Sequence, residues 1–206
     1  MLIDFHIFSI AFTLFLLMDS LGNIPLFIAI LKDLPPKRQR QIILRELLIA
    51  LGVIIIFYFI GNFILDLIHV KQHTVLLAGG IILFLIAIRM VFPEFFYLKP
   101  KKTSSPKEPF IVPLAIPLVA GPAVLASIML YSKEGESPFV VLCALFLAWL
   151  ATSLILLASS LLQKFLGDKG LMACERLMGL LLTLISVQMF LQGISLYVCD
   201  MNQPLP

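Results

Sequence analysis

Long apolar runs separated by short polar segments make up almost the whole chain. Six of these runs hold about 20 residues or more with few charged side chains, which is the length that crosses the hydrocarbon core of a bilayer as an α-helix. We therefore expect an all-α membrane protein with six transmembrane helices. The runs cover residues 5–31, 44–66, 74–92, 109–131, 138–162 and 175–199.

The first and fourth runs are interrupted in their middles by residues that disfavour a helix. The first contains Asp19-Ser-Leu-Gly-Asn-Ile-Pro25, and the fourth contains Pro117-Leu-Val-Ala-Gly-Pro122. Proline removes a backbone donor and clashes with the carbonyl four residues earlier, and glycine loosens the helix further. We expect both helices to be discontinuous, with the second half of the first helix starting near Asn23 or Ile24.

Backbone groups set free at such breaks cannot face lipid, so they must be buried in protein or line a wet cavity. Each second half-helix directs its N-terminal amides toward the break, where they favour an anion such as a carboxylate. Matching breaks in the two halves of a chain indicate the binding site of a transporter. The candidate substrate-binding residues are Asp19, Ser20, Gly22, Asn23, Pro25, Pro117, Ala120, Gly121 and Pro122.

The two halves of the chain resemble each other at a nearly constant spacing. Pro25 matches Pro122 at an offset of 97 residues, and Gly80–Met90 matches Gly179–Met189 at an offset of 99. The second and fifth runs align loosely at an offset of 98. Offsets that change this little along the chain indicate a duplication with small insertions.

The duplication predicts a single integral membrane domain, 1–206, built from two three-span repeats. The repeats cover 1–92 and 109–206, and the Pro- and Lys-rich segment 93–108 joins them as a polar cytoplasmic linker.

The placement of basic residues predicts the orientation of these repeats. Of the 15 Lys and Arg residues, 13 lie in or beside the first, third and fifth connections between runs. Such connections stay in the cytoplasm, so both termini are expected on the external side. Each half has an odd number of spans, so the repeats are inverted relative to each other. Basic residues in these places are orientation signals, and we expect no nucleic-acid partner.

Composition excludes a soluble protein and gives no support to an enzyme. The chain is 61% hydrophobic and 13% charged, with a mean hydropathy of +1.07. The motifs G-x-x-x-x-G-K-[ST], H-E-x-x-H and G-x-S-x-G do not occur, so we expect neither ATP hydrolysis nor these hydrolytic chemistries.

The three cysteines have no metal-binding spacing and are expected to be small buried residues. No cofactor is expected, and surface placement is favoured over a metal site for the three histidines. The N-terminus lacks a cleavable signal, so the first run is expected to be retained.

Asp19 is the only acidic side chain deep within an expected span, and an intramembrane carboxylate indicates function by default. It could bind a substrate ammonium group, coordinate a cation or carry a coupled proton. Beside an amide-rich helix end, it would suit a zwitterion such as an amino acid. The alternative is that Asp19, with Ser20, only caps the second half-helix.

The string Asp19-Ser-Leu-Gly-Asn-Ile-Pro-Leu-Phe27, together with Pro113-Leu-Ala-Ile-Pro-Leu-Val-Ala-Gly-Pro122, resembles the signature of the MarC family of bacterial inner-membrane proteins. Ala78–Ile88 and Glu175–Leu180 resemble the YhgN-like branch of that family. The resemblance covers nearly the whole chain and implies a six-span protein of the inner membrane. Related archaeal members imply transport of small neutral amino acids. The chain departs from the family at Ser20, where proline is usual, which weakens the first break.

We expect a secondary transporter of a small solute, such as a small neutral amino acid, that binds at the midplane between the two discontinuous helices. Coupling to H⁺ or Na⁺ is left open, as is a homo-oligomer, and the other expected partner is membrane lipid. The alternatives are an exporter or channel for another small solute, or a membrane scaffold that does not transport.

Overall fold

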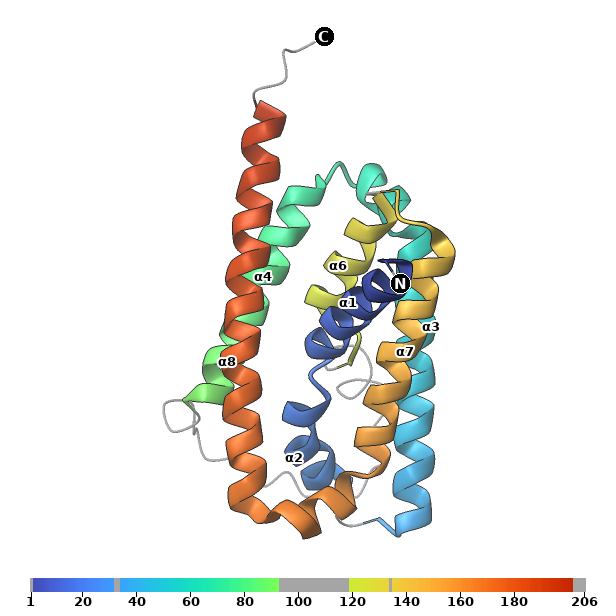
Figure 1. Ribbon diagram of the computed structural model, residues 1–206, viewed down its shortest axis with the longest axis vertical. Helices are drawn as coiled ribbons and strands as arrows, with labels where there is room; N and C mark the ends of the chain where they lie inside the picture. Colours follow the sequence, from blue (N-terminus) through green and yellow to red (C-terminus); the bar gives the residue numbers. More distant parts are fainter. Residues whose placement is uncertain (1, 32–33, 93–118, 134, 202–206) are drawn as a thin grey trace.

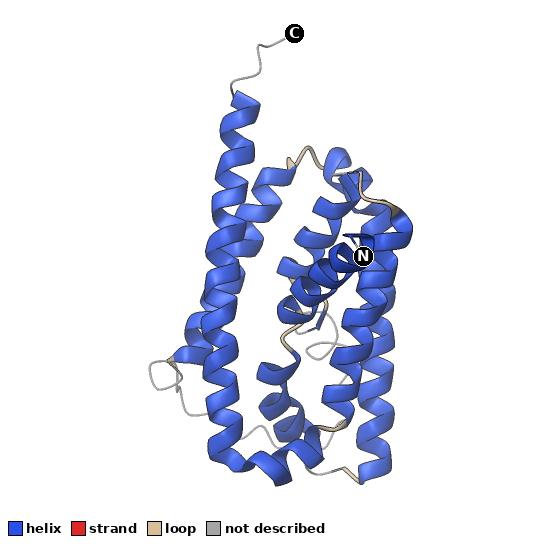
Figure 2. Cartoon of the chain, viewed as in Figure 1, coloured by secondary structure: helices blue, strands red, loops and turns tan. Residues whose placement is uncertain are grey.

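The computed structural model describes residues 2–31, 34–92, 119–133 and 135–201 (Figure 1). All regular secondary structure in these ranges is helical (Figure 2). The helices are α1 (Leu2–Leu17), α2 (Ser20–Leu31), α3 (Pro36–Leu67), α4 (Gln72–Val91), α6 (Pro122–Lys133), α7 (Pro138–Leu157) and α8 (Ser159–Met201).

Five stretches within the described ranges are long and apolar enough to cross a membrane. They are Phe5–Pro25, Pro36–Leu67, Gln72–Val91, Pro138–Leu157 and Lys169–Met201. These correspond to the first, second, third, fifth and sixth of the expected spans. The expected fourth span is described only from residue 119 onward, where its second half forms α6. Its first half and the expected linker 93–108 lie outside the described residues.

The boundaries near the end of α7 differ from the prediction. The apolar pattern predicts a helix over 138–162, but α7 ends at Leu157, and the backbone N–H of Ala158 donates to the Leu154 and Leu156 carbonyl oxygens. A new helical segment starts at Ser159 and changes direction at Gly167, whose φ of 64° and ψ of 176° are not helical. Glycine adopts this positive φ at no steric cost. The long, membrane-spanning part of α8 follows this kink (Figure 1).

Helices α4 and α8 pack side by side and form one side of the molecule (Figure 1). Helix α2 packs against α7 and α8, whereas α6 packs against α3 and α4. Helix α1 packs mainly against α7. The short helices α1 and α6 occupy the upper half of Figure 1, toward both ends of the chain, and α2 occupies the lower half.

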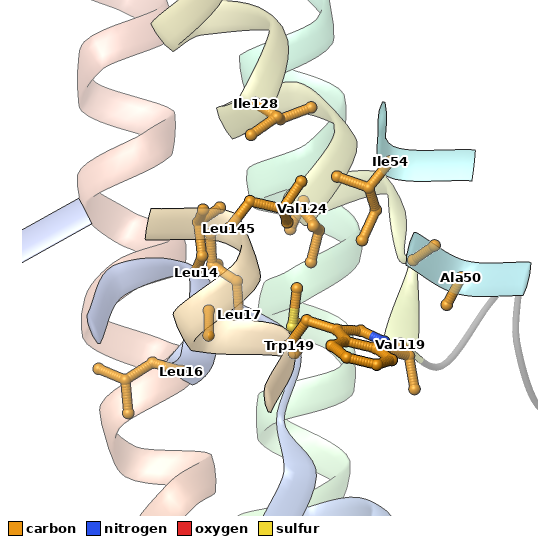
Figure 3. Close-up of a cluster of buried hydrophobic side chains, with 14 of the residues drawn as sticks. Leu14, Leu16, Leu17, Ala50, Ile54, Val119, Val124, Ile128, Leu145 and Trp149 are labelled. Carbon is orange, nitrogen blue, oxygen red and sulfur yellow. The ribbon is translucent and has the colours of Figure 1, made fainter. Parts of the chain in front are cut away.

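Figure 3 shows the buried cluster in which α1, α3, α6 and α7 meet. Leu14, Ile54 and Val124 are completely buried in it. The indole Nε1 of Trp149 donates a 2.8 Å hydrogen bond to the backbone oxygen of Leu47. A buried indole N–H needs such a partner, so this bond fixes α7 against α3.

Large apolar side chains are also widely exposed on the outside of the bundle. Phe5, Phe63 and Phe139 are each about two-thirds to three-quarters exposed, and many Leu and Ile side chains of α4 and α8 are exposed as well. A soluble monomer rarely carries so much contiguous apolar surface. Together with the five spans, this surface supports an integral membrane protein whose outer face contacts lipid.

Candidate functional site

The first discontinuity lies at Met18 and Asp19, between α1 and α2. Asp19 has a φ of +46°, a left-handed conformation that ends α1, and α2 then starts at Ser20. The prediction that the second half-helix starts near Asn23 or Ile24 is therefore wrong by three to four residues. Pro25 does not mark the break but lies inside α2.

Asp19 explains why the break occurs early, because it caps α2. Its side-chain Oδ1 accepts a 3.3 Å hydrogen bond from the backbone N–H of Gly22, and its carbonyl accepts one of 3.1 Å from that of Asn23. A capping carboxylate lets the helix begin directly after it. The capping interpretation of Asp19 is thus confirmed, and a further role remains compatible with it.

Asn23 and Gly22 complete this junction. The Asn23 side-chain amide donates a 3.2 Å hydrogen bond to the Met18 carbonyl, one of the groups left free where α1 ends. A Cβ added to Gly22 would lie 2.5 and 2.7 Å from the two carboxylate oxygens of Asp19. Glycine is therefore required at this position for the carboxylate to fold back over the start of α2.

The expected second break lies directly before α6. Val119, Ala120 and Gly121 precede the helix, which starts at Pro122, within the segment where the sequence predicts a break. The Gly121 carbonyl accepts a 3.0 Å hydrogen bond from the Leu125 N–H, so Gly121 is the N-cap and Pro122 is the first helical residue. Proline suits that position because its missing N–H would have no partner there. The expected site residue Pro117 lies outside the described residues.

The first break and the expected second break meet at one small cavity of about 50 Å³. Asp19 and Asn23 line it from the first break, and Gly121 and Pro122 line it from the second. Four of the nine candidate residues are thus brought together. The cavity has room for a few water molecules but not for an amino acid, so it is closed around its polar groups.

The remaining described candidates lie around this cavity without lining it. Ser20 is completely buried, and its hydroxyl has no hydrogen-bond partner among the described residues. Ala120 is also buried, whereas Gly22 and Pro25 are half-buried. Ser20 therefore leaves an unsatisfied polar group beside the break at the position where proline was expected.

The sequence predicts two amide-rich helix ends that both favour an anion. In the structure, the two ends carry different charges. The Asp19 carboxylate already accepts a bond from the amide end of α2, so it offsets part of the positive end of that dipole. No side chain in the described ranges is bonded to the first free amides of α6, at Ala123 and Val124. One wall of the cavity therefore presents a carboxylate, and the other presents a positive helix end.

Apolar residues that the sequence analysis did not identify complete the cavity. They are Leu17 of α1, Ile82, Leu83 and Ile86 of α4, Ala123 of α6 and Leu182 of α8. The Gly80–Met90 match with Gly179–Met189 indicated that α4 and α8 have equivalent places in the fold. It did not indicate which face of either helix points at the breaks.

Several titratable residues near the connection between α3 and α4 and near the ends of the chain form close contacts. His6 Nε2 lies 3.0 Å from Glu136 Oε1, and Lys71 Nζ lies 2.6 Å from Asp200 Oδ2. His73 Nδ1 lies 3.9 Å from the same Asp200 oxygen. Within the described ranges, no group of three or more His, Cys, Asp or Glu side chains is arranged to hold a metal ion.

Comparison with known proteins matches nearly the whole chain to one family. A model described as "MarC family integral membrane protein" matches residues 5–198. A "UPF0056 membrane protein" of Buchnera aphidicola subsp. Schizaphis graminum is 52% identical over 191 residues, covering 92% of this chain and 96% of that protein. The "UPF0056 inner membrane protein YhgN" of Escherichia coli K12 is 50% identical over 196 residues, covering 94% and 98%. A membrane protein of Chlamydia pneumoniae is 37% identical over 192 residues, covering 91% and 93%. No solved structure matches the chain.

Proposed function

The chain belongs to the MarC family of integral membrane proteins, and we propose that it is a secondary transporter of small solutes with no net charge, such as small neutral amino acids. The observation that carries this proposal is that the break between α1 and α2 and the start of α6 meet at one small cavity, with the Asp19 carboxylate in its wall. Broken helices at the middle of a bundle are how many secondary transporters build their substrate sites. We propose the bacterial inner membrane as the location, since the YhgN relatives are named inner membrane proteins.

An architecture of six spans in two inverted three-span repeats is part of the proposal. If α2 corresponds to α6, α3 to α7 and α4 to α8, exchanging the two halves turns the α2–α8 contact into the α6–α4 contact. The same exchange turns the α2–α7 contact into the α6–α3 contact, and all four contacts are observed. The α4–α8 and α3–α7 contacts, which are also observed, map onto themselves. This pattern supports a two-fold relationship between the halves.

The cavity has the charge arrangement that a zwitterion requires. The ammonium group of an amino acid would pair with Asp19, and its carboxylate would accept hydrogen bonds from the amides at the start of α6. A solute with only one of these charges would leave the opposite wall of the cavity without a partner. The apolar remainder of the lining suits a small aliphatic side chain.

Transport requires this closed cavity to open, because about 50 Å³ does not admit the solute. The break at Met18–Asp19 lets α1 and α2 move separately, and α6 starts at a break of its own. Movement of one half-helix at a time would expose the cavity to one side of the membrane and then to the other. Asp19 is also the residue we propose for coupling to H⁺ or Na⁺, since its carboxylate can bind either cation.

Uptake of labelled alanine, serine and glycine into proteoliposomes tests the proposal, with imposed H⁺ or Na⁺ gradients. We expect saturable uptake by the wild-type protein and a loss of at least tenfold in Asp19→Asn, which retains the cap but not the charge. Asp66→Asn, an exposed carboxylate on the same chain, serves as the matched control. Undiminished uptake by Asp19→Asn under every gradient would remove Asp19 from the mechanism. Uptake that never saturates would indicate a channel, and absence of both uptake and solute binding would indicate a scaffold.

A further inference from the structure

A second and larger cavity lies next to the one at the breaks. Its volume is about 490 Å³, within the range of small-molecule binding pockets. It lies among α1, α4, α6 and α8, in the half of the molecule that contains α1 and α6, and it is open at the outer surface of α8, where Leu184 and Gln188 are exposed. Its lining residues include Leu17, which also lines the cavity at Asp19. A single buried leucine therefore belongs to the walls of both spaces.

Polar side chains from three helices converge on this larger cavity. Thr13 comes from α1, Ser127 from α6, and Gln188 and Gln192 from α8. The two glutamines are four residues apart and therefore share one face of α8. The Thr13 hydroxyl donates to the Ser9 carbonyl at 3.0 Å, but the side chains of Ser127 and the two glutamines make no hydrogen bond to any described residue.

Gln188 is exposed and Gln192 is half-buried, both on a stretch of α8 that is apolar enough to cross a membrane, so their amides need a polar partner there. A primary amide left without a hydrogen bond in hydrocarbon destabilises the protein, because its lost hydration is not replaced. The face of α8 that carries Gln188 and Gln192 is thus unsuited to lipid tails, while the neighbouring Val187 and Leu191 suit them well. Water or a polar solute in the cavity supplies the missing partners.

The lining also contains no charged side chain. An ion that entered the cavity would lose part of its hydration and find no counter-charge in the walls. A molecule with balanced charges or with amide and hydroxyl groups would not meet this penalty. Glutamine side chains both donate and accept hydrogen bonds, so they can contact either end of a zwitterion.

We propose that the cavity lined by Thr13, Ser127, Gln188 and Gln192 is a water-filled vestibule and a first binding station for net-neutral polar solutes, separated from the Asp19 cavity by Leu17. The proposal rests on the proposed transport function. It adds where the solute binds before it reaches Asp19 and how charged solutes are rejected. Given the expected orientation of the termini, this vestibule faces the external side.

Cysteine labelling tests the vestibule without relying on transport. In a background where Cys143, Cys174 and Cys199 are replaced by serine, Gln188→Cys and Ser127→Cys are treated in intact cells with a small, membrane-impermeant methanethiosulfonate. We expect rapid labelling of both. Val187→Cys is the matched control, since Val187 lies next to Gln188 and is exposed but lines the apolar groove between α4 and α8 instead of this cavity. The vestibule would be contradicted if Gln188→Cys and Ser127→Cys were not labelled. It would also be contradicted if Val187→Cys were labelled equally fast.

Protection experiments test the binding station separately. We expect a net-neutral amino acid to slow labelling of Gln192→Cys at least threefold, and we expect lysine and glutamate at the same concentration to leave the rate unchanged. Equal protection by the charged amino acids, or protection by none of the panel, would overturn the binding assignment.

Transport kinetics then separate this inference from the function on which it rests. We expect Gln188→Leu to raise the KM for uptake about fivefold or more with little change in maximal rate, whereas Asp19→Asn abolishes uptake. If the wild type transports solute but Gln188→Leu leaves the KM unchanged, the binding station is contradicted and the proposed transport function is not. If the wild type itself transports nothing, the proposed function fails, and labelling with protection still decides the vestibule and its ligand.

Discussion

Gly80 of α4 packs directly against the backbone of Ser186 in α8, where a Cβ added to the glycine would lie 3.0 Å from the Ser186 carbonyl oxygen. The same contact recurs with the helices exchanged. A Cβ added to Gly179 of α8 would lie 3.1 Å from the Ala87 carbonyl oxygen of α4. Gly80 and Gly179 are 99 positions apart in the chain, and so are Ala87 and Ser186. Two helices related by a two-fold axis would make such reciprocal contacts.

These glycine contacts predict the effect of enlarging the side chain. We expect Gly80→Val and Gly179→Val each to destabilise the protein by about 1–3 kcal/mol, because the added atoms push against backbone that cannot rotate away. The measurement is thermal unfolding of the purified protein in detergent.

Gly52 supplies the control for both variants, since no atom lies within 4 Å of a Cβ added there. Gly52→Val should therefore unfold within a degree or two of the wild type. A Gly80→Val protein as stable as Gly52→Val would mean that α4 and α8 are farther apart than the structure shows.

Gly22→Ala should disturb the first break without touching the second. Its Cβ would be forced against the Asp19 carboxylate, so the bond from the Gly22 N–H to Oδ1 would be lost. We expect a loss of stability of about 0.5–2 kcal/mol, the usual value of an N-cap, together with reduced solute uptake. Thermal unfolding and proteoliposome uptake measure the two effects, and wild-type values for both would show that the cap is dispensable.

Asp19 variants should separate capping from function. Asparagine caps a helix as well as aspartate and tolerates a positive φ, so Asp19→Asn should unfold within about 0.5 kcal/mol of the wild type. Alanine does neither, and Asp19→Ala should be destabilised by about 1 kcal/mol or more. We expect both variants to lose uptake. An active, stable Asp19→Asn would leave capping as the only role of this residue.

The charge pattern predicts where the C-terminus lies. Alkaline phosphatase fused after Pro206 should be active and green fluorescent protein fused there should be dark, because only the former folds outside the cytoplasm of a bacterium. Fusions after Phe92, within the expected cytoplasmic connection, should give the reverse result. The same outcome at both positions would contradict the inverted arrangement of the repeats.

Local sequence was a sufficient guide to the spans and an incomplete guide to the breaks. Spans follow from the length of apolar runs, which is why five of them are found within the described residues. The first break was expected in the right segment but too late, because the conspicuous Pro25 was given more weight than Asp19. A left-handed, capping Asp19 ends one helix and begins the next, so Pro25 is accommodated one turn into α2.

By itself, the sequence determined the class of protein, the approximate ends of the spans, the family and the two segments in which helices break. Each of these depends on composition or on residues close together in the chain. Only the tertiary structure decided that residues of both segments meet at one cavity, that α4 and α8 supply most of its apolar wall, and that Leu17 also lines a second, larger cavity. The physical reason is that these helices are apolar nearly all the way round. Apolar side chains are suited both to contact with lipid and to packing in the protein core. The periodicity of the sequence therefore cannot distinguish the helix face that packs inward from the face that contacts the membrane.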